Sequence, residues 1–481
     1  MTASGTASRR VVVLGAGIGG LAAAALLASA GHRVTIIEGN EWIGGKSRRI
    51  EVDGQRIDTG PSLVTFPAVW EELLRRCDDL GRSPVLDAAT ISNLALTRLP
   101  EVGRYFFDGT STTLPVEEGH PWHEAWVRFE RVHGGFGPQI TAMLTAHPLD
   151  PKALPAALTL FRTYGTRLTA RRFLDGLAWM PHGLREVIAI HSLNAGVSPA
   201  RSLALYASMP AVMARDGVWV PEGGVYEVPL ALHRLARHAG AEVRTGERVI
   251  SVTEGAVRTV SAEYRADVVV SGLDAQVLED LLPDAQPPSR RALTCSGVAI
   301  YAVLERNLPA PTATHSVVMP DDPAALHRSL AMGAVPEQTM AFVNYFRPNE
   351  VYPNERPTVA LLLTAPADGR GYDLDDPFIE REIGRISRAI GISDPMTEWF
   401  RACKVFDPRY FAASGAAGGA LYGATRPLWQ SGPLHRPSYH DRRRPWLWRV
   451  GASVHPGGGI PAVLGGAMVS MDKLLRQLAV R

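Results

Sequence analysis

The sequence predicts an α/β fold whose central parallel sheet is assembled from segments that lie far apart in the chain. Three observations support this: a glycine-rich turn between a strand and a helix near the N-terminus, a similar turn near the C-terminus, and short apolar strands near the middle. With 481 residues, the chain is long enough for several structural units and more than one core.

The first strand–turn–helix unit begins with the apolar run 11–14, which is typical of a parallel strand buried on both faces. The glycine-rich turn 15–20 leads into helix-forming residues that end before Gly31. A second strand is expected over 33–37, and Glu38 closes it. The helix N-terminus favours phosphates, and a carboxylate at this position can bind ribose hydroxyls. The unit therefore predicts a dinucleotide site formed by Gly15, Ala16, Gly17, Gly19, Gly20 and Glu38.

The glycines have different expected roles. Gly15 permits the tight turn, Gly17 lets a pyrophosphate approach the backbone, and Gly20 lets the helix pack close to the strand. Two other interpretations of the stretch are a helix start without a ligand and a secretory signal or weak membrane span. The glycine spacing and the strand that follows argue against both.

A second group of small residues decides between NAD and FAD. Gly44, Gly45 and Lys46 follow the first unit, and Asp58-Thr59-Gly60-Pro61-Ser62 follows a short strand. These segments resemble the extended motif of two-dinucleotide-binding-domain flavoproteins. The resemblance implies FAD, with Gly45 and Lys46 near the phosphates or flavin and Gly60, Pro61 and Ser62 near the isoalloxazine. A solvated loop lysine is the alternative for Lys46. A single dinucleotide motif gives no support to a separate NAD(P)H site.

The C-terminal unit is a strand over 446–450, a loop over 451–461 and a helix from about 462 to 478. N–H groups at the start of this helix could stabilise a reduced flavin at N1 and O2. We therefore expect Gly451, Gly459 and Ile460 to bind the cofactor. His455 is the catalytic candidate because imidazole accepts a proton near neutral pH. The alternative is that His455 is structural.

Taken together, these motifs and the GVWVPEGG segment at 217–224 resemble the carotenoid desaturases of the phytoene desaturase type. The HPGGGIP segment at 455–461 is the most specific part, and the resemblance covers essentially the whole chain. It implies FAD-dependent introduction of C=C bonds into a long apolar polyene, and it implies that Val249 holds the adenine through its backbone. The alternative for Val249 is an ordinary strand residue. Lys46 and Thr59 favour slightly the hydroxycarotenoid 3,4-desaturase branch over phytoene desaturase proper.

The order of the segments predicts a discontinuous, Rossmann-like FAD-binding domain with an inserted α+β substrate domain. The FAD-binding domain is expected to comprise residues 1–80, 216–290 and 441–481. The inserted domain is expected to comprise a mainly helical, membrane-facing segment over 81–215 and a sheet with helices over 291–440.

Composition limits the partners. A net charge of +2 gives no support for nucleic-acid binding, and the three cysteines have no spacing typical of a metal site or disulfide framework. Apolar residues at helical spacing in 154–161 are followed by arginines at 162, 167, 171 and 172. This pattern predicts docking on anionic lipid; the alternative is a core helix with solvated arginines. We therefore expect a cytoplasmic, peripherally membrane-associated enzyme with a carotenoid substrate and oxygen or a quinone as electron acceptor.

Two other classes remain open at this point. One is a flavin amine or protoporphyrinogen oxidase, which shares the N-terminal motif, although His-Pro-Gly at 455–457 stands where amine oxidases need an aromatic pair. The other is a non-catalytic prenyl-lipid carrier resembling the GDP-dissociation inhibitors. Glu38 and the glycine loops argue against a carrier. The sequence leaves open the exact carotenoid, the number of desaturations and the oligomeric state.

Overall fold

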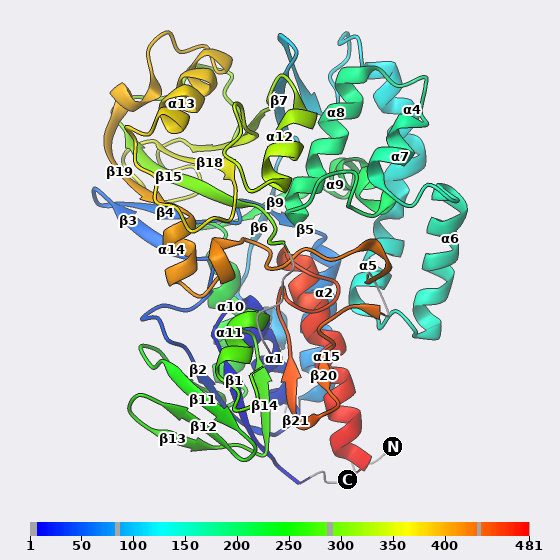
Figure 1. The fold of residues 1–481 in the computed structure, drawn as a ribbon, viewed down its shortest axis with the longest axis vertical. Helices are drawn as coiled ribbons and strands as arrows, with labels where there is room; N and C mark the ends of the chain where they lie inside the picture. The colour runs from blue at the N-terminus through cyan, green and yellow to red at the C-terminus, as the bar shows by residue number, and fades with distance from the viewer. Residues whose placement is uncertain (1–6, 82–86, 286–291, 431–433, 481) are drawn as a thin grey trace.

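Two large sheets of different construction organise the molecule, and each has its own helices (Figure 1). The computed structural model describes residues 7–81, 87–285, 292–430 and 434–480. The first six residues of the stretch that resembles a secretory signal lie outside these ranges.

The first sheet combines strands from both ends and the middle of the chain, in the order β10-β2-β1-β14-β21-β20. All neighbouring strands are parallel except β20, which pairs antiparallel with β21. The strands are β1 (Arg10–Leu14), β2 (Arg33–Ile37), β10 (Glu242–Arg244), β14 (Val268–Ser271), β20 (His440–Asp441) and β21 (Arg444–Arg449). The strands predicted over 11–14 and 33–37 are therefore confirmed.

Both faces of this sheet are buried, which explains its continuously apolar strands. Val11 and Val13 pack in one core with helices α1 (Ile18–Ser29), α10 (Glu227–His238) and α15 (Ile460–Val480). Val12 and Leu14 face the opposite core. That core is covered by the strands β11 (Val249–Thr253), β12 (Ala256–Thr259) and β13 (Glu263–Arg265) and by helix α11 (Ala275–Asp280). Alternate residues thus enter different cores, and both sets must be apolar.

The second sheet has seven strands in the order β19-β15-β18-β17-β16-β7-β8. Its strands are β7 (Gly103–Phe107), β8 (Thr110–Leu114), β15 (Ser296–Leu304), β16 (His315–Val318), β17 (Ala341–Phe346), β18 (Thr358–Ala365) and β19 (Phe400–Phe406). Helix α13 (Pro377–Ala389) covers one face through Ile383 and Ile386. The other face packs against the hairpin of β3 (Arg49–Val52) and β4 (Gln55–Asp58) and against α14 (Pro408–Ala413).

The remaining elements lie mostly between residues 64 and 221. They are β5 (Val64–Thr65), α2 (Pro67–Leu80), α3 (Ala88–Ser92), β6 (Leu96–Arg98), α4 (His123–His133), α5 (Gly137–Thr145), α6 (Leu154–Tyr164), α7 (Ala170–Asp175), α8 (His182–Ile190), α9 (Met209–Asp216), β9 (Val218–Pro221) and, further on, α12 (Pro323–Ala331). Segment 81–215 is mainly helical after residue 117, but β7 and β8 belong to the seven-stranded sheet. The domain bounds given above stay a prediction. No helix in the described ranges is both long and apolar enough to span a bilayer.

Candidate cofactor and active site

Three glycine loops from distant parts of the sequence meet at the N-terminus of α1. The N–H of Gly44 donates to the carbonyl of Ala16 at 2.7 Å, and Gly45 lies so close to Gly17 that an added Cβ would be 3.3 Å from the Gly17 Cα. On the other side, a Cβ added to Gly19 would lie 2.9 Å from the backbone of Gly451. The structure therefore brings the predicted residues of the two chain ends together.

Gly15 and Gly20 are required by the chain itself. Gly15 has φ +87°, in the left-handed region that favours glycine. A Cβ added to Gly20 would lie 2.0 Å from the carbonyl oxygen of Gly15, which is a direct clash with backbone. These two residues hold the turn and the close helix–strand contact in the roles that the sequence predicts.

Gly17 is different because nothing in the chain requires it to be glycine. Its φ is −68°, which any residue can adopt, and an added Cβ would meet no atom within 4 Å. It is the N-cap of α1, where no side chain caps the helix and no acidic residue occupies the first turn. Open space beside uncapped N–H groups of a 12-residue helix fits a phosphate group.

Glu38 lies next to the same turn, at the end of β2. Its buried carboxylate accepts hydrogen bonds from the N–H of Ala16 at 2.8 Å and from the N–H of Asn40 at 2.9 Å. The carbonyl of Glu38 accepts from the N–H of Glu247 at 2.8 Å, two residues before β11 begins at Val249. Glu38 and Val249 therefore lie on neighbouring segments, as the ribose and adenine assignments require, although the contact of Val249 with adenine stays a prediction.

Lys46 connects its loop to a segment that lies far away in the sequence. The residue as a whole is exposed, but its ammonium donates to the carbonyls of Ala420, at 3.3 Å, and Leu421. Removal from bulk water lowers the pKa of Lys46 to about 8, and the charge of Asp274 partly opposes this shift. The role of Lys46 at the cofactor stays a prediction, beside the alternative of a solvated loop lysine.

The remaining predicted cofactor residues lie in open loops. Gly60 has φ +105°, and a Cβ there would meet no atom within 4 Å; Pro61 is exposed and Ser62 is half-buried. Gly459 has φ +92° and directly precedes α15. Ile460, the first residue of α15, lines a small apolar cavity with Val64, Phe66, Trp70, Leu94 and Val228.

The structure does not bring His455 together with the dinucleotide loops. Its ring lies 5.8 Å from that of His435 and lines a separate cleft that also includes His147. Burial, together with the charges of His147 and Arg426, lowers the pKa of His455 to about 4. At neutral pH this imidazole is uncharged and a weak proton acceptor. The catalytic role of His455 stays a prediction. Its side chain forms part of the cleft wall.

Sequence reasoning missed an ion-pair cluster that fixes the segment before Gly60. Asp58 is buried and accepts from Arg49 Nε at 2.9 Å and from the N–H of Tyr226 at 2.9 Å, while Arg49 also pairs with Glu227 at 3.2 Å. Burial raises the pKa of Asp58, and Arg49 opposes the rise. The hairpin register that pairs Arg49 with Asp58 was the available signal. The cluster joins β4 to the start of α10.

The parallel sheet, the uncapped helix start and the second glycine loop define the protein as an FAD-binding oxidoreductase. FAD fits the open space beside Gly17 and beside Gly60. The family model described as flavin containing amine oxidoreductase matches residues 18–352. The chain belongs to that family, and the α/β flavoprotein fold and the FAD cofactor predicted from the sequence are confirmed.

Curated relatives match the chain over nearly its whole length. A zeta-carotene-forming phytoene desaturase of Myxococcus xanthus is 29% identical and covers 99% of this chain and 95% of its own. A 4,4'-diapophytoene desaturase (4,4'-diaponeurosporene-forming) of Staphylococcus aureus is 24% identical and covers 98% of this chain and 99% of its own. The resemblance to carotenoid desaturases is therefore confirmed.

Solved structures share the fold at lower identity. Putrescine oxidase bound to putrescine has a TM-score of 0.65 at 16% identity and covers 99% of this chain and 100% of its own. Cyclohexylamine oxidase from Brevibacterium oxydans IH-35A has a TM-score of 0.60 at 15% identity and covers 98% of this chain and 99% of its own. At these identities the likeness concerns the fold alone.

Proposed function

We propose that the protein is an FAD-dependent carotenoid desaturase that introduces C=C bonds into a long apolar polyene. One observation carries the proposal: relatives named as phytoene and diapophytoene desaturases match 98–99% of the chain, so the similarity includes the part that must hold the substrate. The amine oxidases match over the same length at only 15–16% identity. An amine oxidase is therefore the second candidate, and a carrier without flavin is not supported.

The chain's own residues supply binding and orientation. FAD, when bound, supplies the hydride acceptor. The glycine loops around Gly17 and Gly451 hold the cofactor, and the apolar side chains around Ile460 exclude water beside it. Lys46 places an ammonium beside the carbonyls of Ala420 and Leu421, where its positive charge favours negative charge on a neighbouring group.

Pigment analysis after co-expression tests this function and its finer alternatives. The chain is expressed with enzymes that make phytoene, 4,4'-diapophytoene, lycopene or a 1-hydroxycarotenoid, and the pigments are separated and identified. We expect at least one substrate to gain conjugated double bonds. Conversion of the 1-hydroxycarotenoid alone would support 3,4-desaturation, and conversion of phytoene would support phytoene desaturation. No pigment change with any substrate, in cells that contain the folded yellow protein, would refute the proposal.

We also propose that the enzyme acts on the cytoplasmic surface of a membrane, through α6. Three large apolar residues of this helix are exposed, although its other face is buried: Leu154 is 58% exposed, Leu158 47% and Phe161 65%. The alternative of a core helix is therefore wrong for this stripe. Figure 1 shows α6 at the outer edge of the molecule. An exposed apolar stripe of this kind, flanked by cations, is typical of a helix that lies in a bilayer interface.

The neighbouring arginines divide into two groups. Arg162, Arg167 and Arg172 are exposed and available to anionic lipid, whereas Arg171 is paired with Asp175 at 2.8 Å and with Glu186 at 2.7 Å. The charge beside the stripe is thus smaller than the sequence alone indicates.

Sedimentation of the protein with lipid vesicles tests the membrane proposal. The double variant L158S/F161S is expected to lose most of its binding, because transfer of its apolar side chains into the interface is lost. V132S, at an exposed position of α4, is the matched control and should bind like the unmodified protein. Equal binding of all three proteins would refute docking through α6.

The electron acceptor is proposed to be oxygen or a membrane quinone. Reoxidation of the reduced flavoprotein is measured without oxygen, on vesicles with and without quinone, and then in air. Oxidation by quinone alone identifies the quinone, and oxidation in air alone identifies oxygen. A flavin that stays reduced under both conditions would refute both acceptors.

A further inference from the structure

A cleft of about 450 Å³ lies between the β20–β21 hairpin, α15 and the connection from α5 to α6. Its lining includes His455 from the loop 451–461, but none of the glycines of the cofactor loops. Its polar lining is almost entirely cationic or hydrogen-bond donating, and consists of His147, His435, Ser438, Tyr439, His440, Arg442, Trp448, His455, Lys473 and Gln477. Among the described residues that line it, none is acidic.

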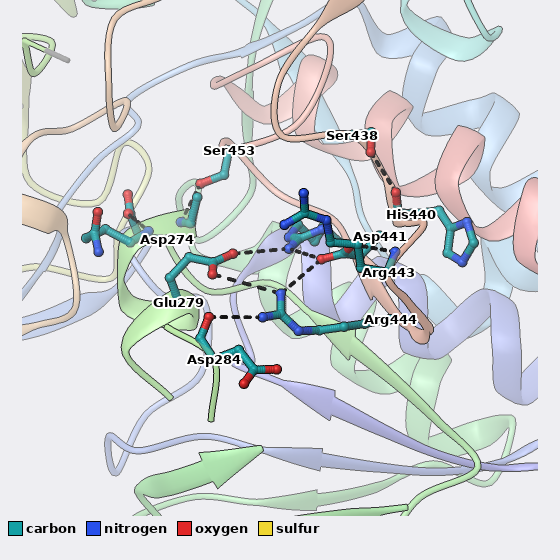
Figure 2. A network of polar contacts seen from close by, with 12 residues as sticks. Asp274, Glu279, Asp284, Ser438, His440, Asp441, Arg443, Arg444 and Ser453 are labelled. Carbon is teal, nitrogen blue, oxygen red and sulfur yellow. Dashed lines mark hydrogen bonds and ion pairs between the residues drawn. The ribbon is translucent and has the colours of Figure 1, made fainter. Parts of the chain in front are cut away.

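Two carboxylates beside the hairpin, Asp441 and Glu279, are paired with arginines. Asp441 pairs with Arg444 and with Arg449, each at 3.2 Å, and Glu279 pairs with Arg449 at 3.4 Å. Figure 2 shows Asp441 and Arg444 directed toward Glu279, while the imidazole of His440 points away from it. The cleft therefore keeps its positive charge without compensation from this network.

The two flexible cations of the cleft are also without acidic partners. Within the described parts of the chain, neither Arg442 nor Lys473 forms an ion pair, and Lys473 lies 5.8 Å from the ring of Tyr439. Burial lowers the pKa of His147, the charge of Lys473 lowers it further, and the charge of Asp150 partly opposes both. At neutral pH the positive charge of the cleft therefore comes from Arg442 and Lys473, and this charge favours a bound anion.

The wall of the cleft contains two donors that lack acceptors. The hydroxyl of Tyr439 and the indole N–H of Trp448 are buried, with no hydrogen-bond partner among the described residues. The ring of His440 stacks on Trp448 with a centroid distance of 4.5 Å and holds it in place. Buried donors without acceptors are rare in folded proteins and cost free energy, so a ligand that brings acceptor oxygens is favoured here.

The cleft is connected to α6 by the chain at Leu149. Leu149 lines the cleft and is 71% exposed, and the chain reaches the first residue of α6, Leu154, five positions later. A ligand with a charged group in the cleft and an apolar chain across Leu149 would therefore contact both surfaces at once. A phospholipid has this combination.

We propose that this cleft binds the phosphate group of an anionic phospholipid. This inference rests on the proposed membrane association for the source of the phosphate. The phosphate oxygens accept charge-assisted hydrogen bonds from Arg442 and Lys473 and further bonds from the histidines and the Tyr439 hydroxyl. Apolar contact through α6 gives affinity for any bilayer, and the cleft adds preference for an anionic headgroup.

Vesicle binding by the FAD-loaded protein tests the proposal. Affinity is measured for vesicles of phosphatidylcholine alone and for vesicles that also contain phosphatidylglycerol. We expect tighter binding to the anionic vesicles. R442Q and K473Q should each lower that affinity about tenfold or more, because each loses a hydrogen bond to a charged group. Y439F should lower it without any change in charge.

The matched control is R476Q, which removes the same charge from the next turn of α15 but lies outside the cleft lining. It should lower affinity no more than about fivefold, the general effect of one cation near an anionic surface. A loss in R476Q equal to that in K473Q would overturn the cleft. Equal binding of the unmodified protein to both kinds of vesicle would also overturn it, while the proposed membrane association would stand.

Two further outcomes separate the remaining alternatives. If the protein binds neither kind of vesicle, the membrane proposal itself fails, and the lipid source fails with it. Calorimetry with glycerol phosphate and inorganic phosphate identifies the source of the anion. Binding of either soluble anion as tightly as anionic vesicles would overturn the lipid assignment.

Discussion

Replacing Gly17 with alanine separates the needs of the fold from those of the cofactor. The added methyl meets no atom of the chain within 4 Å, and φ of −68° is normal for alanine. The lower backbone entropy of the unfolded state favours alanine by about 0.4–1 kcal/mol, and the poorer N-cap partly offsets this. We therefore expect the free energy of unfolding of the apoprotein to change by less than about 1 kcal/mol.

The effect on FAD should be much larger. The methyl would occupy the space that the pyrophosphate needs beside the N-terminus of α1. An extra methyl in a filled site costs about 1–3 kcal/mol, which corresponds to a roughly 5- to 150-fold rise in the Kd for FAD. The change in the Kd for FAD therefore tests the position of the phosphates, because the stability of the fold should change little.

Two measurements on the same variant check this reasoning. Thermal unfolding of the apoprotein gives its stability, and quenching of flavin fluorescence during titration gives the Kd. Gly20→Ala is the contrasting variant, because its methyl would lie 2.0 Å from the Gly15 carbonyl oxygen and should destabilise the apoprotein by about 3 kcal/mol or more. An unchanged Kd for Gly17→Ala would refute the placement of the phosphates.

Three further predictions concern charge and burial. With its pKa at about 8, Lys46 loses its proton as pH rises through that value. Turnover should therefore fall above about pH 8, and the variant Lys46→Gln should lack this fall in its pH–rate profile. Burial raises the pKa of the thiols of Cys77 and Cys295 to about 12, so mass spectrometry should find both unalkylated by iodoacetamide in the native protein and alkylated after unfolding. Burial lowers the pKa of His133 to about 4. As pH falls, the unfolded chain binds this proton before the folded chain does, so the free energy of unfolding should fall between about pH 6.5 and 4. Urea titrations that find the same acid sensitivity in His133→Gln and in the unmodified protein would contradict this.

The cofactor turn could be predicted because its requirements are local. Gly15 and Gly20 are demanded by backbone geometry within one strand–turn–helix unit, and the sequence shows the spacing directly. The meeting of Gly19 with Gly451 needed more information, since only two similar units at opposite ends suggested that they share a site. Continuously apolar strands are typical of a parallel sheet with both faces buried, and this pattern placed both units in one sheet.

Other features depend on how distant elements pack. Helical spacing shows that Leu154, Leu158 and Phe161 share a face, but periodicity alone does not show whether that face meets the core or the solvent. His455 lies in the expected loop, yet its side chain lines the cleft with His147, which comes from the connection after α5. A loop position does not determine the direction of a side chain, and no local signal joins residues 147 and 455.

The interleaving of β1, β14 and β21 in one sheet also has a consequence for synthesis on the ribosome. In this sheet β14 lies between β1 and β21. It therefore has only one of its two neighbours until residues 444–449, which form β21, have left the exit tunnel. Helix α1, apolar on all sides, remains without its α15 neighbour until then. Loading of the cofactor is thus a step that follows translation, and a chain that stops before α15 exposes apolar surface that chaperones and proteases recognise.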